Sequence, residues 1–397
     1  MSDTEDARGK KTPYTVGVMS IPYYHNYGTQ LQAFALQEAI RGLGYDVEMI
    51  NFVKGGPAPK PLSSRLVGLL IRPLTIYPRI RRRIAHAAWR RLTEPRRRLT
   101  QDFISQRLAL NPPKMTEEDQ LLSVSGRYDA VVVGSDQIWN PQGHLGEQAF
   151  FLTFVRPALR VAYAPSIGVC TVNGDAADWL ASGARGINHL SVREASGAEI
   201  LKDLIGRDVP VVVDPTLLHD DEFWGGIARG SSNKERPYVL CYFLQGDAYA
   251  REAAKKFANE KGFRLRVLPF HQVDLQDRLM RKGSEFEVGP LEFLDSFRNA
   301  SAVFTDSFHG TIFSVVFRRP FAAFRRYDNP VEAGNFSRIE GFLARIGLTS
   351  QVASREEVPD LEGISFERAH VELDRWRRQS IEFLKSSLIR ATGREGP

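Results

Sequence analysis

Residues 128–141 read YDAVVVGSDQIWNP, a stretch whose first part, 128–133, is apolar except for Asp129 and ends in small and polar residues. A short, continuous apolar run bounded by turn residues is typical of a strand buried on both faces, as in a parallel sheet. Open α/β sheets bind ligands beyond the carboxyl ends of their strands, so the polar residues at 134–137 mark a candidate site.

Apolar runs of the same kind recur along the chain and alternate with segments of helical spacing. Up to residue 225 they lie at 14–19, 46–52, 160–164, 189–192 and 209–213. After a Gly- and Ser-rich, charged stretch they continue at 238–244, 264–268, 302–305 and 321–324. Strands that alternate with helices favour parallel sheets, so the sequence predicts an α/β fold with two Rossmann-like domains facing a cleft.

The predicted domains meet at the charged stretch. We place an N-terminal α/β domain at 12–225, interrupted by a basic helical insertion at 60–110, and a C-terminal α/β domain at 236–350. A final amphipathic helix is expected within 360–393, where it would pack back across both domains.

Composition excludes several classes of protein. Apolar residues make up 43% and charged residues 25% of the 397-residue chain, near the globular average, which rules out wholesale disorder. The longest wholly apolar run, 66–71, is far shorter than the ~20 residues of a membrane-spanning helix. No apolar segment of a signal peptide is visible and two cysteines form no disulfide framework, so we expect a cytoplasmic protein.

The net charge of +6 comes from one segment. Residues 60–107 contain one lysine and twelve arginines against two acids, a net +11, so the rest of the chain carries −5. Because acidic partners are nearly absent there, we expect an external polyanion as the partner. Charge alone leaves a membrane surface and nucleic acid open, but no base-reading motif is present, so no specific nucleic acid is expected.

Motifs for common cofactors are absent. The chain has no GxGxxG after its first strand, no Walker loop, no metal-ligand spacing and no GxSxG elbow. We therefore expect no metal and no cofactor. A phosphorylated ligand would be held by arginine, histidine, hydroxyl groups and helix N-termini.

Residues 305–314, TDSFHGTIFS, form the strand-to-helix junction with the most chemistry. Ser307 is a candidate N-cap, and the free N–H groups beyond it suit an anion. Histidine is the side chain whose unperturbed pKa is close to neutrality, so His309 is a candidate phosphate ligand and proton donor. The alternative is an ordinary capped helix with an interior histidine.

A second junction, 191–197 or SVREASG, places Arg193 at the end of an apolar strand. The planar guanidinium suits a carboxylate or a phosphate. The alternative is a salt bridge from Arg193 to Glu194 or to the neighbouring domain.

Two further junctions offer groups that suit a sugar. In GSDQIWNP, 134–141, Asp136 and Gln137 can bind hydroxyls or take a proton, and Trp139 offers an apolar face; the alternatives are an Asx-turn and a core tryptophan. In HNYGTQLQ, 25–32, Gly28 permits close backbone approach at a polar helix entry, and the alternative is helix capping.

Seven strings taken together resemble the polysaccharide pyruvyl transferase family. They occur in this order across 14–348: NYGTQLQAFALQ, YDAVVVGSDQIWNP, VAYAPSIG, LSVREASG, VVVDPTLL, TDSFHGTIFSVVF and RRPF. The resemblance implies a GT-B-like fold. It also implies transfer of pyruvate from phosphoenolpyruvate to a sugar as a cyclic ketal, with release of phosphate.

The resemblance also implies roles for particular residues. Arg193 and His309 would contact phosphoenolpyruvate, the donor substrate. Ser307 stands where some relatives have an arginine, so a further cation would complete the phosphate site; the candidates by chain position are Arg325, Arg326 and Arg338, and we expect Arg338. The expected acceptor side comprises Asp136 with Asn26, Tyr27, Gln30, Ser135, Gln137 and Trp139.

These expectations combine into one reaction. We assign His309 as phosphate ligand and candidate general acid, and Asp136 as candidate base. The expected acceptor is a lipid-linked saccharide precursor of an exopolysaccharide or capsule, and residues 60–107 would hold the enzyme at the anionic inner face of the cell membrane. The alternative is a GT-B glycosyltransferase that uses a nucleotide sugar.

Overall fold

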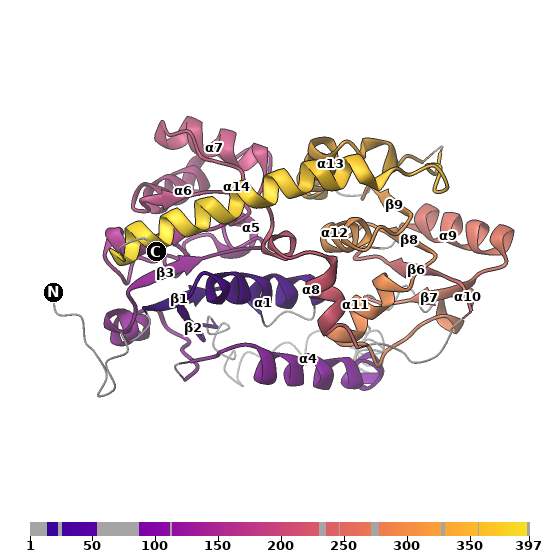
Figure 1. Ribbon diagram of the computed structural model, residues 1–397, viewed down its shortest axis with the longest axis horizontal. Coiled ribbons are helices and arrows are strands. Elements are labelled where there is room, and N and C mark those ends of the chain that lie inside the picture. Colours follow the sequence, from indigo (N-terminus) through magenta and orange to yellow (C-terminus); the bar gives the residue numbers. More distant parts are fainter. Residues whose placement is uncertain are drawn as a thin grey trace, which may run out of the picture.

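The protein consists of two parallel sheets with helices packed on their faces (Figure 1). The structure is a computed structural model. It describes residues 14–22, 26–53, 87–111, 113–229, 236–245, 247–270, 278–326, 330–355 and 357–394.

The N-terminal sheet has five parallel strands in the order β2-β1-β3-β4-β5. They are β1 (Thr15–Met19), β2 (Asp46–Met49), β3 (Ala130–Val133), β4 (Arg160–Ala162) and β5 (His189–Leu190). All four residues of β3 are buried, as its continuous apolar run predicts. The run at 209–213 does not join the sheet as a strand; only Val211 forms a bridge, to Val192.

The C-terminal sheet has the same plan, in the order β10-β9-β8-β6-β7. Its parallel strands are β6 (Tyr238–Tyr242), β7 (Arg264–Val267), β8 (Ala302–Thr305), β9 (Phe321–Phe324) and β10 (Val352–Ala353). Strand order reverses between β1 and β3 in the first sheet and between β6 and β8 in the second. Such switch points leave a crevice at the carboxyl ends of the strands, which is where ligands bind in this class of fold.

The helices follow the strands as a βαβ plan requires. Those of the N-terminal half are α1 (Tyr27–Gly42), α4 (Glu94–Arg107), α5 (Pro141–His144), α6 (Gly174–Arg185), α7 (Ala195–Ile205) and α8 (Asp221–Ile227). Those of the C-terminal half are α9 (Ala248–Lys261), α10 (Arg278–Lys282), α11 (Pro290–Arg298), α12 (Phe308–Val316), α13 (Pro330–Ile346) and α14 (Phe366–Thr392).

Helix α14 runs back from the C-terminal domain over the N-terminal one, as predicted (Figure 1). Three of its side chains form hydrogen bonds with residues 211–217, the segment that precedes the C-terminal domain. Ser380 Oγ accepts from the Val213 N–H, Trp376 Nε1 donates to the Val211 carbonyl, and Arg377 Nε donates to the Leu217 carbonyl. This segment, 211–217, is therefore held from outside by α14.

The described part of the basic insertion reaches the other domain. Helix α4 packs against α11, and the buried Arg96 donates from Nη1 to the Pro269 carbonyl. Pro95 lies in the first turn of α4, where its missing N–H is tolerated. Residues 54–86 lie outside the described residues, as does most of the predicted insertion.

One apolar core continues from the first sheet to the second. It includes Val16 and Ala130 of the N-terminal sheet, Leu240 and Val303 of the C-terminal sheet, and Leu384 of α14. Within the described residues, no helix is both long and apolar enough to cross a lipid bilayer.

Candidate functional site

Side chains from both domains converge on one buried carboxylate, Asp214. It follows the apolar run 209–213, and both the Thr216 N–H and Oγ1 donate to its Oδ1, at 3.0 and 2.7 Å. Its Oδ2 lies 2.7 Å from Arg193 Nη1 of the N-terminal domain and 3.5 Å from His309 Nε2 of the C-terminal domain. Asp214 thus joins the two residues that the sequence analysis placed on opposite lobes.

His309 lies in the first turn of α12 and is packed against the first turn of α1. It is 4% exposed. A Cβ added at Gly28 would lie 2.1 Å from His309 Nδ1, so only glycine allows this contact. Gly28 therefore acts as the point of close approach that the sequence analysis expected.

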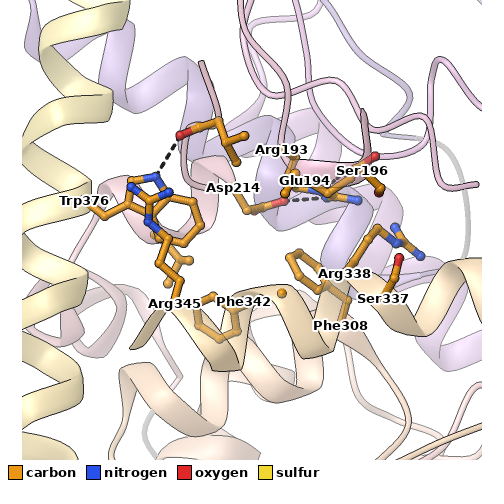
Figure 2. A pocket seen from close by; sticks show the side chains of 14 residues that line it. Arg193, Glu194, Ser196, Asp214, Phe308, Ser337, Arg338, Phe342, Arg345 and Trp376 are labelled. Carbon is orange, nitrogen blue, oxygen red and sulfur yellow. Dashed lines mark hydrogen bonds and ion pairs between the residues drawn. The ribbon is translucent and has the colours of Figure 1, made fainter. Parts of the chain in front are cut away.

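A cavity of about 170 Å³ opens beside Asp214 between the two domains and α14 (Figure 2). Arg193 and Arg338 both face Phe308, with Cζ at 4.6 and 5.7 Å from the ring centre. Such cation–π contacts hold guanidinium groups without neutralising them. At the far end of the cavity Arg345 stacks over Trp376 at 4.2 Å. The lining thus carries charged groups of both signs at one end, and an arginine among aromatic side chains at the other.

Electrostatics keep the buried carboxyl groups ionised. Burial by itself would raise the pKa of Asp214, but His309 and Arg193 outweigh it and hold that pKa well below its usual range. The pKa of Asp136 is also lowered, since Arg193, 3.8 Å away, and His309 outweigh its burial. Conversely, burial and the nearby Arg193 lower the pKa of Arg338 to about 10.

Hydrogen-bonding capacity is left over at this site. Arg193 is 4% exposed, yet its Nε and Nη2 have no hydrogen-bond partner among the described residues, and neither has His309 Nε2. Buried donors without acceptors are rare and costly, so unused donors beside a cavity are typical of a ligand site. The arrangement can hold a small anion between two domains.

A model of the family described as polysaccharide pyruvyl transferase matches residues 26–329. The chain belongs to this family. A comparison with curated protein sequences gives no match.

One solved structure, with a TM-score of 0.50, supports the fold of this family member; two others are similar at lower scores. A proposed UDP-N-acetylglucosamine 2-epimerase from Listeria monocytogenes is 9% identical over 97% of this chain and 92% of its own, with a TM-score of 0.50. UDP-GlcNAc 2-epimerase from Neisseria meningitidis is 10% identical over 95% and 94%, with a TM-score of 0.46. Arabidopsis thaliana UGT89C1 is 12% identical over 97% and 98%, with a TM-score of 0.44. The fold is GT-B: two Rossmann-like domains facing a crevice.

Of the predicted donor-side residues of this pyruvyl transferase family member, Arg193 and Arg338 line the cavity, whereas Ser307 and His309 are buried at the start of α12 and are not part of its lining. Ser307 is the N-cap of α12, and its side chain accepts from the Gly310 N–H. Of the three candidate cations, Arg338 lines the cavity. Arg325 forms an exposed ion pair with Glu340, and Arg326 donates to the Asp306 carbonyl.

Two predicted acceptor-side residues are corrected. Trp139 is fully buried in the N-terminal core, where Nε1 donates to the Phe150 carbonyl, so it presents no face to a sugar. Tyr27 is 1% exposed; its ring stacks on Phe293 and its hydroxyl donates to the Val288 carbonyl. Both side chains serve packing because apolar and aromatic surface is most favourably buried.

The remaining acceptor-side residues lie near the same junctions. Asp136 accepts from Thr29 Oγ1 at 2.7 Å, and Asn26 caps α1 by accepting from the Gly28 N–H. The side-chain Oε1 of Gln137 accepts from Asn140 Nδ2. Both Gln30 and Ser135 are buried, and the Ser135 hydroxyl donates to the Ala164 carbonyl. Their roles toward an acceptor stay predictions.

Two site residues were missed. Asp214 stands first in DPTLL, directly after an apolar run, and the rule that drew attention to Asp136 would have found it. Glu194 was considered only as a salt-bridge partner of Arg193. In the structure it lines the cavity, and its Oε2 lies 3.9 Å from Arg193 Nε.

Proposed function

We propose that this protein transfers the pyruvyl group of phosphoenolpyruvate to a saccharide, forming a cyclic ketal and releasing phosphate. The observation that carries the proposal is the meeting of Arg193 and Arg338 from opposite domains around one cavity, with donors of Arg193 unused. Family membership supports the same reaction.

The ligand chemistry suits this cavity. Phosphoenolpyruvate carries a phosphate and a carboxylate on a three-carbon frame, so it needs two closely spaced cationic clamps. Arg193 and Arg338 flank Phe308 and can supply them. Ser307 caps α12, and His309 lies in the first turn of the same helix. We infer that His309 contacts the phosphate.

Ketal formation requires proton movement in both directions. The methylene carbon must gain a proton, the attacking sugar hydroxyl must lose one, and the tetrahedral adduct must expel phosphate before the second hydroxyl closes the ring. We assign His309 as the general acid, since it is a buried imidazole 3.5 Å from Asp214, which lines the cavity. Asp136 remains the base predicted from the sequence.

A ligand-stabilisation measurement tests the donor. Phosphoenolpyruvate at about 100 times its Kd should raise the free energy of unfolding by about 2.7 kcal/mol, because it binds only the folded state. UDP- and GDP-sugars should give no shift. The reverse pattern would favour the nucleotide-sugar glycosyltransferase, which the GT-B fold alone leaves open. Thermal unfolding with each ligand separates the two.

We infer that the acceptor is a lipid-linked saccharide of an exopolysaccharide or capsule pathway, met at an anionic membrane surface through residues 60–107. Arg90 and Arg91 are exposed in the described part of this segment.

Replacing Arg90 and Arg91 with glutamine should therefore weaken sedimentation with vesicles rich in anionic lipid, since each basic residue near such a surface contributes about 1 kcal/mol. Replacing the exposed Arg375 and Arg378 of α14 removes the same charge elsewhere and should leave sedimentation unchanged. Equal binding by both double variants would contradict a membrane role for the segment.

A further inference from the structure

One carboxylate at the cavity is bonded through one oxygen only. Glu194 is 7% exposed, and its Oε1 accepts from Ser166 Oγ at 3.0 Å and from the Ile167 and Gly168 N–H groups at 2.7 and 3.2 Å. Its Oε2 is buried and has no hydrogen-bond partner among the described residues. Three donors on one oxygen fix the orientation of the side chain and leave the other oxygen available.

The available oxygen belongs to a cavity-lining residue. Glu194 lines the cavity together with Arg193, Ser196 and Arg338 (Figure 2). The neighbouring cation, Arg193 Nε, lies 3.9 Å from Oε2, which is too far for a hydrogen bond. A buried acceptor without a donor is destabilising, so its retention beside a cavity points to a donor that arrives with a ligand.

The chemistry of the two substrates identifies that donor. Fully ionised phosphoenolpyruvate offers only acceptors, whereas a saccharide offers hydroxyl donors. The other two carboxylates near Arg193 already accept hydrogen bonds from protein side chains: Asp136 Oδ2 from Thr29, and Asp214 from Thr216 through Oδ1 and from Arg193 through Oδ2. Asp214 therefore has both oxygens engaged, whereas Asp136 Oδ1 and Glu194 Oε2 lie 3.8 and 3.9 Å from Arg193, beyond hydrogen-bond distance. Of these two carboxylates, only Glu194 lines the cavity.

We propose that Glu194, in place of Asp136, is the base that deprotonates the attacking saccharide hydroxyl. This inference rests on the proposed function. The hydroxyl O–H bond breaks and its proton goes to Glu194 Oε2, while the oxygen electron pair forms the bond to C2 of phosphoenolpyruvate. The C2–C3 π electrons take a proton at C3 from protonated His309. The products are the tetrahedral phosphate adduct, a protonated Glu194 and a neutral His309.

The Glu194→Gln variant separates this role from a structural one. Its amide oxygen can keep the three hydrogen bonds to residues 166–168. The amide NH₂ group takes the place of Oε2 and cannot accept a proton. Phosphoenolpyruvate should still shift thermal unfolding, because the change removes a negative charge beside the donor. Phosphate release with p-nitrophenyl glycosides as acceptors should fall by about 10²–10⁴-fold, the usual contribution of general base catalysis.

Controls make the outcomes distinct. Glu199→Gln changes an exposed glutamate on α7 and should match the wild type in both measurements. Wild-type phosphate release in Glu194→Gln, or loss of its phosphoenolpyruvate shift, would overturn the inference. A wild-type protein with no phosphoenolpyruvate shift would instead refute the proposed function.

Chemical rescue provides a second measurement if Glu194→Gln does not fold. The Glu194→Ala variant leaves space for formate, which can accept the hydroxyl proton in place of Oε2. Formate, and not an equal concentration of chloride, should then restore phosphate release. A folded Glu194→Ala protein that formate does not rescue would count against a proton-accepting role.

Discussion

The His309→Ala variant is expected to release phosphate from phosphoenolpyruvate about 10²–10⁴-fold more slowly than the wild type, because it lacks the proton donor to the methylene carbon. His309 lies 3.5 Å from Asp214 and contacts Gly28, so the substitution also removes the contact between the first turns of α12 and α1. Phosphate release under saturating phosphoenolpyruvate measures the effect.

A conservative variant distinguishes proton donation from packing. His309→Gln keeps an N–H donor on a side chain of similar size but cannot deliver a proton, so it should be as slow as His309→Ala. His144→Gln alters a histidine at the end of α5 that contacts Glu147, and this variant should behave as the wild type. Near-wild-type turnover in either His309 variant would remove this residue from the mechanism.

The Asp214→Asn variant should lose about 3–5 kcal/mol of unfolding free energy at pH 7, because it leaves Arg193 buried without its closest counterion. Asparagine keeps the size of the side chain, so the effect reports charge. Urea unfolding of both proteins measures it, and Asp208→Asn is the matched control, since Asp208 is 88% exposed and should change stability little.

The pH dependence of this difference has a definite sign. The folded-state pKa of Asp214 is depressed, so its stabilising contribution is fully present above the unfolded pKa of about 3.9 and is lost as the pH falls below it. The two unfolding free energies should therefore converge in acid. A difference that stays constant from pH 7 to pH 3 would show that Asp214 acts through something other than its charge.

The sequence predicted much of this arrangement because strand ends carry a local signal. The runs at 130–133 and 302–305 have no apolar–polar alternation, and each ends at the carboxyl edge of its own parallel sheet, where polar residues follow. Arg193 and His309 were found in this way, and both lie beside Asp214.

The remaining details depend on contacts between segments far apart in the chain. The sequence around Trp139 and Tyr27 does not distinguish an aromatic side chain that binds a sugar from one that is buried in a core. The structure shows that they are buried, Trp139 against Phe151 and Tyr27 against Phe293. Nothing local shows that α4 crosses to the other domain, or that Glu194 bonds residues 166–168.

The apolar interior shared by both domains and α14 restricts large movements of the protein. Opening the crevice by a wide hinge rotation would expose side chains such as Leu240 and Leu384 to water, at about 25 cal/mol for every Å² uncovered. Substrates must therefore enter through local rearrangement at the edges of the crevice. The same interior couples the unfolding of the two halves, because loss of either one would expose to water the apolar surface that it shares with the other.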